Sequence, residues 1–165
     1  MSNTNTQQVK KQITIMLTSG RSIVLSDNMS DETYKKIIDQ VEDVVNNTDS
    51  VDNERSLEFT TDTDKVYIHH RHVSFIGMKK KVAHNPNLYK YEIVLHLVNG
   101  KTIIFSNEEV DENIQKYQDL IDVGMKFHST KPFIVLPSIN ETLFINNDKL
   151  CSGVIRKRNI DHGGT

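Results

Sequence analysis

Two segments of this 165-residue chain repeat the same pattern 80 positions apart. Residues 13–26 and 93–106 both carry alternating apolar residues around a glycine, and Gly20 falls on Gly100. Alternation with period two is typical of a strand with one buried face, and glycine supplies the positive φ that a hairpin turn needs. Each segment is therefore predicted to be a β-hairpin, with a tight type I′ turn favoured by the Asn-Gly pair of the second copy.

An amphipathic helix is predicted after each hairpin. In the first copy Ser30 is placed as the N-cap, ahead of two acidic residues that suit the helix dipole. Asp111 and Glu112 repeat those two residues 80 positions later, and Gly124 is placed as the end of the second helix. The first helix has its apolar residues at helical spacing, namely Tyr34, Ile37, Ile38, Val41, Val44 and Val45.

A second strand pair is predicted to close each copy. Residues 65–68 match 142–145, and residues 73–78 match 150–155, both at a separation of 77. A length change of three residues is tolerated in a loop between helix and strand. The predicted fold class is α+β: a tandem duplication of a β-hairpin–helix–β-hairpin module, with mostly antiparallel sheet and a pseudo-two-fold relation between the modules.

The repeat also predicts how the chain is divided. We expect a flexible N-terminus at residues 1–9 and a first module at 10–82, followed by a linker at 83–89 around Pro86. The second module is expected at 90–158, with a flexible C-terminus at 159–165.

Composition restricts the compartment and the partners. The net charge is −2 and the pI about 6.4, so no global field favours nucleic acid or an anionic membrane. The single cysteine excludes an internal disulfide framework and favours a reducing compartment. With no secretory signal or membrane span recognised, we expect a cytoplasmic protein. The abundance of Asn, Ile and Lys suggests an AT-rich genome such as that of a phage, for which the location would be the host cytoplasm.

Each module ends in a basic triplet, and the two triplets are candidate polyanion-binding residues. They are Lys79, Lys80 and Lys81 in the first module and Arg156, Lys157 and Arg158 in the second. Cations in matching places could bind phosphates, with an affinity that falls as salt rises. The alternative interpretation is that they guard an edge strand against aggregation.

Two other clusters have a functional and a structural interpretation. His70 and His72 could share a strand face and hold a metal, but the matching residues 146–149 indicate a turn, which favours exposed histidines. The acidic residues Asp39, Glu42 and Asp43 on the first helix form either a solvated face or a docking surface for a basic partner. Cys151 is expected to be a buried, inert thiol.

No phosphate loop, nucleophile elbow, zinc-protease motif or EF-hand loop is recognised, and no catalytic residue or cofactor is assigned. The leading hypothesis is therefore a non-catalytic accessory module that binds a host or viral protein and is able to self-associate. One alternative is nucleic-acid or polyanion binding through the basic triplets. Another is capture of a small ligand, such as a signalling nucleotide, between the modules.

Overall fold

The computed structural model describes residues 11–27, 30–47, 56–60, 64–80, 88–126 and 133–158. The predicted flexible ends and most of the predicted linker lie outside these ranges. The first half of the chain contains β1 (Lys11–Leu17), β2 (Ser22–Asp27), α1 (Asp31–Asn47), β3 (Ser56–Thr60), β4 (Lys65–His69), the 3₁₀ turn η1 (His70–His72) and β5 (Val73–Lys79). The second half contains β6 (Tyr91–Leu97), β7 (Thr102–Phe105), α2 (Glu108–Glu112), α3 (Ile114–Lys126), β8 (Phe133–Leu136), β9 (Glu141–Asn146), the 3₁₀ turn η3 (Asn147–Lys149) and β10 (Leu150–Lys157).

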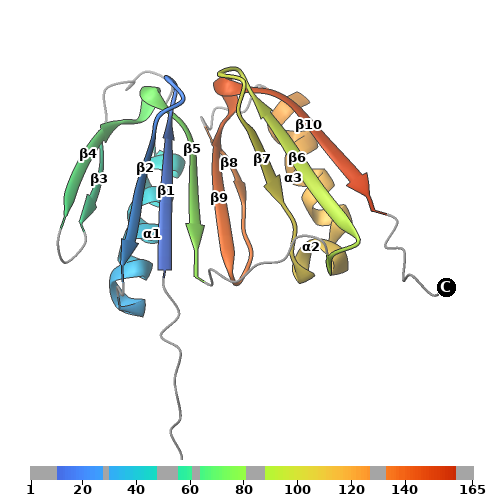
Figure 1. The fold of residues 1–165 in the computed structure, drawn as a ribbon, viewed down its shortest axis with the longest axis horizontal. Helices are drawn as coiled ribbons and strands as arrows, with labels where there is room; N and C mark the ends of the chain where they lie inside the picture. Colours follow the sequence, from blue (N-terminus) through green and yellow to red (C-terminus); the bar gives the residue numbers. More distant parts are fainter. Residues whose placement is uncertain are drawn as a thin grey trace, which may run out of the picture.

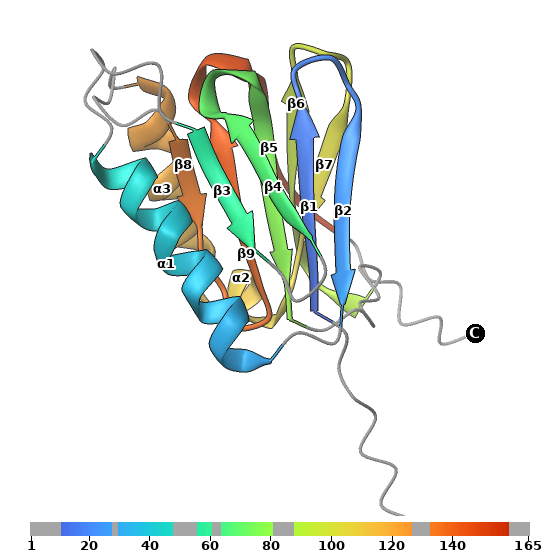
Figure 2. The ribbon, with the colours of Figure 1, turned by 90° about the vertical axis from the view of Figure 1, so that its left-hand side faces the viewer.

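The fold is α+β with antiparallel sheets, as predicted. A five-stranded sheet has the order β2-β1-β5-β9-β8, a three-stranded sheet the order β10-β6-β7, and β3 pairs with β4. Figure 1 shows β4 at one end of the row of strands and β10 at the other, with β5 and β9 in the middle. Figure 2 shows that α1 and α3 lie on the same side of the strands. The five-stranded sheet contains strands from both halves of the chain, so the halves share one sheet.

Strand registers agree between the halves at the separations found in the sequence. Partners on β1 and β2 recur 80 positions later on β6 and β7, and partners on β3 and β4 recur 77 positions later on β8 and β9. The β1–β5 register likewise matches the β6–β10 register, and both shift by one residue at the same place. Examples are Ile13↔Leu25 with Ile93↔Phe105, Leu57↔Ile68 with Ile134↔Ile145, and Ile15↔Ile76 with Leu95↔Gly153.

The predicted second hairpins are wrong. β4 and β5 follow one another through η1 but do not pair, because β4 pairs with β3 whereas β5 lies between β1 and β9. β9 and β10 are separated in the same way. The sequence prediction also missed β3 and β8, so the described part of each half has two strands, a helical region and three further strands. Period-two alternation identifies a strand but not its partner, and β3 and β8, with five and four residues, are too short for a clear alternation.

The two hairpin turns differ in detail from the predicted turn type. In the first hairpin, Leu17 donates to the carbonyl of Arg21 and accepts from Gly20, which gives a three-residue loop with Gly20 at φ +89°. The second hairpin repeats this arrangement with Gly100 at φ +84°. These loops match a type I turn followed by a left-handed residue, rather than type I′.

Ser30 caps α1 as predicted, since its Oγ accepts from the N–H of Thr33 at 3.1 Å. The second helical region instead begins at α2, where Asn107 Oδ1 accepts from Val110 N–H, and breaks at Asn113. Gly124 lies inside α3 and does not end it, so the predicted helix end is wrong. Ile134 of β8 packs so close to it that a Cβ at Gly124 would lie 2.5 Å from Ile134 Cγ1. The glycine is therefore a packing residue.

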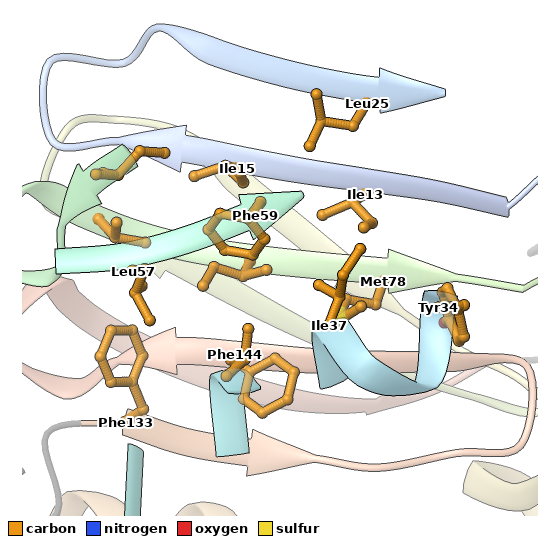
Figure 3. Packing of buried hydrophobic residues seen from close by; sticks show 14 residues of the cluster. Ile13, Ile15, Leu25, Tyr34, Ile37, Leu57, Phe59, Met78, Phe133 and Phe144 are labelled. Atoms are coloured by element: carbon orange, nitrogen blue, oxygen red, sulfur yellow. The ribbon is translucent and has the colours of Figure 1, made fainter. Parts of the chain in front are cut away.

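Two hydrophobic clusters stabilise the fold, and each contains residues from both halves. The first cluster packs α1, β3 and one face of the central sheet, and it includes Phe133 and Phe144 from the second half (Figure 3). The second cluster packs α2, α3 and the three-stranded sheet, and it includes Phe75 from β5. Every residue of β5 from Val73 to Met78 is buried, as expected for a strand that is covered on both faces.

Candidate interaction surfaces

Among the described strands, β2, β3, β4, β7, β8 and β10 each pair with a single neighbour, and β4 and β10 lie at opposite ends of the row of strands (Figure 1). Within the described strands, β4 pairs only with β3, and β10 only with β6. An edge strand presents unpaired backbone N–H and C=O groups and can pair with another chain. On β4 the side chain of Tyr67 is 61% exposed, and the Lys65 ammonium lies 5.3 Å from the centre of its ring. Both open edges are thus possible sites for strand addition.

A groove of about 470 Å³ runs between β10 and α3. Its apolar part contains Ile121, Met125, Ile155 and the backbone of Gly153, where the missing side chain leaves the floor open. The remaining lining is polar or acidic: Gln115, Gln118, Asp119 and Asp122. Neither the exposure of Tyr67 nor this groove could be predicted from the sequence, because both depend on which strands lie at the ends of their sheets.

The basic triplets are largely engaged within the molecule. Arg158 and Arg156 contact Glu92, a carboxylate only 7% exposed, with N–O distances of 2.8 Å and 3.4 Å. Lys79 lies 3.8 Å from the buried carboxylate of Glu141. Lys80 and Lys157 are exposed, and Lys81 lies outside the described residues. Three of the six predicted polyanion ligands therefore neutralise buried carboxylates.

The acidic docking candidates are exposed on one helix. Asp39, Glu42 and Asp43 all lie on the solvent face of α1. Their positions fit the predicted docking surface and equally fit a solvated helix face, so this cluster alone does not define a site.

The histidine cluster forms a turn. His70 to His72 make up η1, as the turn prediction implied, and the ring of His72 accepts from Arg71 Nε at 3.3 Å. The side chain of His70 lies outside the described part of the chain. No group of three His, Cys, Asp or Glu side chains suited to a metal ion occurs among the residues that the structure describes.

A cavity of about 360 Å³ lies where the halves meet, between β5, β9 and α2. Its lining combines Lys79 with four carboxylates, those of Glu108, Glu109, Glu112 and Glu141. Burial raises the pKa of Glu141, and the nearby Lys79 opposes this shift only in part. Burial, and after it the nearby carboxylate of Glu109, also raises the pKa of Tyr117 on α3 to about 12. Acidic walls of this kind repel phosphate groups, so the cavity does not favour a signalling nucleotide.

Cys151 and His96 are both exposed. Cys151 is exposed on β10, so the prediction of a buried thiol is wrong; its strand is an open edge, which alternation cannot reveal. His96 is exposed on β6, and its Nδ1 lies 3.2 Å from Thr102 Oγ1 on β7. This contact links neighbouring strands and gives the histidine a structural role.

No described helix is long and apolar enough to cross a membrane. Comparison with protein-family models, curated proteins and solved structures gives no match to this chain.

Proposed function

We propose that this chain is a non-catalytic protein-binding module, and that it binds through its open strand edges, β4 and β10. The observation that carries the proposal is the combination at β10 of an open edge with an adjacent groove whose floor is apolar. Backbone hydrogen bonds along an edge provide affinity, and a side pocket provides specificity. The engaged basic triplets and the acidic cavity offer weaker support for polyanion or nucleotide binding.

We further propose that the chain arose by tandem duplication, with its two copies arranged head to tail. Matching strand registers at two fixed separations support the duplication. If a two-fold axis related the two halves, β10 would pair with β4 of the same chain in the way that β5 pairs with β9. Since β4 and β10 lie at opposite ends of the strand row (Figure 1), the head-to-tail arrangement fits better than the pseudo-two-fold relation expected from sequence.

A pull-down of the full chain from a bacterial lysate tests the binding function. The lysate is divided into nuclease-treated and untreated halves, and retained proteins are compared between the wild type and the edge variants Tyr67→Asp and Gly153→Asp. We expect a protein that is retained in both halves and lost with an edge variant. Val98→Asp is the matched control, because Val98 is 56% exposed in the β6–β7 hairpin turn and lies on neither β4 nor β10.

Three results would contradict the proposal. Retention of the same proteins by wild type and edge variants would exclude the strand edges. Loss only with the combined Asp39→Asn, Glu42→Gln and Asp43→Asn variant would move docking to the acidic face of α1. Loss on nuclease treatment would favour the polyanion alternative.

A further inference from the structure

The contact between β5 and β9 shows how one half of the chain binds the other. The strands are antiparallel, and Ile76 of β5 lies opposite Phe144 of β9. The ring of Phe144 is fully buried in the first cluster, together with Ile37 of α1 (Figure 3). The open edge of the first half is thus occupied by a strand whose aromatic side chain packs between that edge and a helix.

The same two surfaces recur, unoccupied by any described strand, at the ends of the molecule. By the separation of 77, β10 corresponds to β5 and β4 corresponds to β9. One end of the chain thus carries the counterpart of the receiving edge, and the other end carries the counterpart of the strand that it receives (Figure 1). A single chain cannot join them, but a second copy can.

The apolar groups at these two ends are complementary. Tyr67 occupies the position on β4 that Phe144 occupies on β9, and it is 61% exposed instead of buried. Gly153 occupies the position of Ile76, and the groove between β10 and α3 lies open above it. The aromatic ring is therefore exposed at one end, and a site for an aromatic ring is empty at the other.

Polar groups follow the same correspondence. The ion pair of Lys79 with Glu141 flanks the β5–β9 contact, and the matching positions hold Arg156 and Asp64, which again have opposite charges. Asp119 and Asp122 line the groove, while Lys65 stands beside Tyr67 on the opposite end. Lys65 also lies 2.9 Å from Glu58, and Arg156 lies 3.4 Å from Glu92, so these charges contribute to the choice of register rather than to a net attraction between the ends.

We infer that a second copy of this chain binds head to tail, with β10 of one copy pairing antiparallel with β4 of the next and Tyr67 entering the groove over Gly153. The expected register places Gly153 opposite Tyr67 and Val154 opposite Val66, as Ile76 and Gly77 lie opposite Phe144 and Leu143. The inference rests on the proposed binding function and names its partner. A contact between two different surfaces leaves one free edge at each end, so it builds rings or filaments of more than two chains.

The molar mass in solution tests the inference. The wild-type chain, measured by light scattering and mass photometry over a concentration series, should form oligomers of three or more 18.9 kDa units. Tyr67→Asp and Gly153→Asp should each give monomers, whereas Val98→Asp should assemble like the wild type. A side chain at Gly153 meets its nearest atoms at 3.5 Å or more, so this variant retains room to fold. Met125→Asp, at a residue 42% exposed in the same groove, is a second variant should Gly153→Asp fail to fold.

Mixing the two monomeric variants gives the sharper test. Tyr67→Asp retains an intact β10 edge, and Gly153→Asp retains an intact β4 edge. In an equimolar mixture, β10 of the Tyr67→Asp chain can therefore pair with β4 of the Gly153→Asp chain, and no other pairing of edges is possible. The mixture should form 1:1 dimers and nothing larger. A monomeric wild type at every concentration, an edge variant that assembles normally, or a mixture that stays monomeric would each overturn the inference. Capture of a different protein through the same edges would in that case leave the proposed binding function standing.

Discussion

Phe144 on β9 lies directly opposite Ile76 on β5, and both side chains are fully buried in the cluster that α1 covers. An aromatic ring from the second half of the chain thus completes the core of the first. The second cluster contains the converse contact, because Phe75 of β5 packs among residues of the second half. The two halves should therefore fold together and unfold in one transition.

Replacing Phe144 by alanine should destabilise the whole chain. Loss of a fully buried phenylalanine costs about 3–5 kcal/mol through lost burial and the cavity that remains. Urea unfolding followed by circular dichroism measures the change. Tyr67→Ala is the matched control, since it removes an aromatic ring from the corresponding but exposed position on β4 and should cost within about 0.5 kcal/mol in the monomer. Equal effects of the two substitutions would contradict the assigned packing.

Gly124→Ala should destabilise the chain although alanine is the better helix former. The new methyl group would lie 2.5 Å from Cγ1 and 2.6 Å from Cδ1 of Ile134, which is buried and has little room to move. Overpacking of this kind costs about 1–3 kcal/mol. Thermal unfolding measures the loss, and Ile134→Ala in the same chain should make the alanine at 124 less costly. A more stable Gly124→Ala variant would show that α3 and β8 are less closely packed.

Arg158→Gln should reduce stability more than Lys157→Gln. The guanidinium of Arg158 lies 2.8 Å from the carboxylate of Glu92, whereas Lys157 is exposed. Losing a hydrogen bond to a buried charged group costs about 1.5–3 kcal/mol. Chemical denaturation of both variants gives the comparison, since both remove one positive charge. If both variants were as stable as the wild type, the triplet would be a surface feature and its polyanion role would regain support.

Glu141 should make the chain less stable as the pH rises. Burial raises its pKa in the folded state above the ordinary value of 4.5, so the folded chain retains its proton where the unfolded chain has lost it. Stability must therefore fall as the pH rises from 4.5 through the raised pKa. The stability difference between Glu141→Gln and wild type should become more favourable to the variant from pH 4 to pH 7 in urea unfolding. Glu42→Gln, on the exposed face of α1, is the control for the loss of one negative charge. If the stability of both variants changed with pH in the same way, the raised pKa of Glu141 would be refuted.

Local features of the fold were predictable because they depend on neighbouring residues. The hairpins around Gly20 and Gly100 and the cap at Ser30 follow from alternation, from positive φ and from a side-chain oxygen near free N–H groups. Partner choice was not predictable in this way. Whether β5 pairs with β4 or with β9 depends on contacts between residues about 70 positions apart, and no local pattern records them.

The candidate surfaces were harder to predict for the same reason. The charges of Arg156, Lys157 and Arg158 were evident in the sequence, but their engagement depends on Glu92, more than 60 positions away in the chain. Tyr67 resembles any alternating strand residue until the strand is known to lie at an edge. Exposure at the ends of sheets is a property of topology, and here it is what distinguishes Tyr67 from Phe144.

The pairing of β5 with β9 also affects the order in which the chain can mature on the ribosome. Lys79, at the end of β5, is synthesised well before Asn146 completes β9. At a synthesis rate of about 5–20 residues per second, several seconds pass between the completion of β5 and the completion of β9. During that time the nascent chain presents a bare apolar edge, Val73 to Met78, to whatever lies near it. Neighbouring nascent chains on one messenger RNA would each carry this edge, which favours exchange of β9 between them.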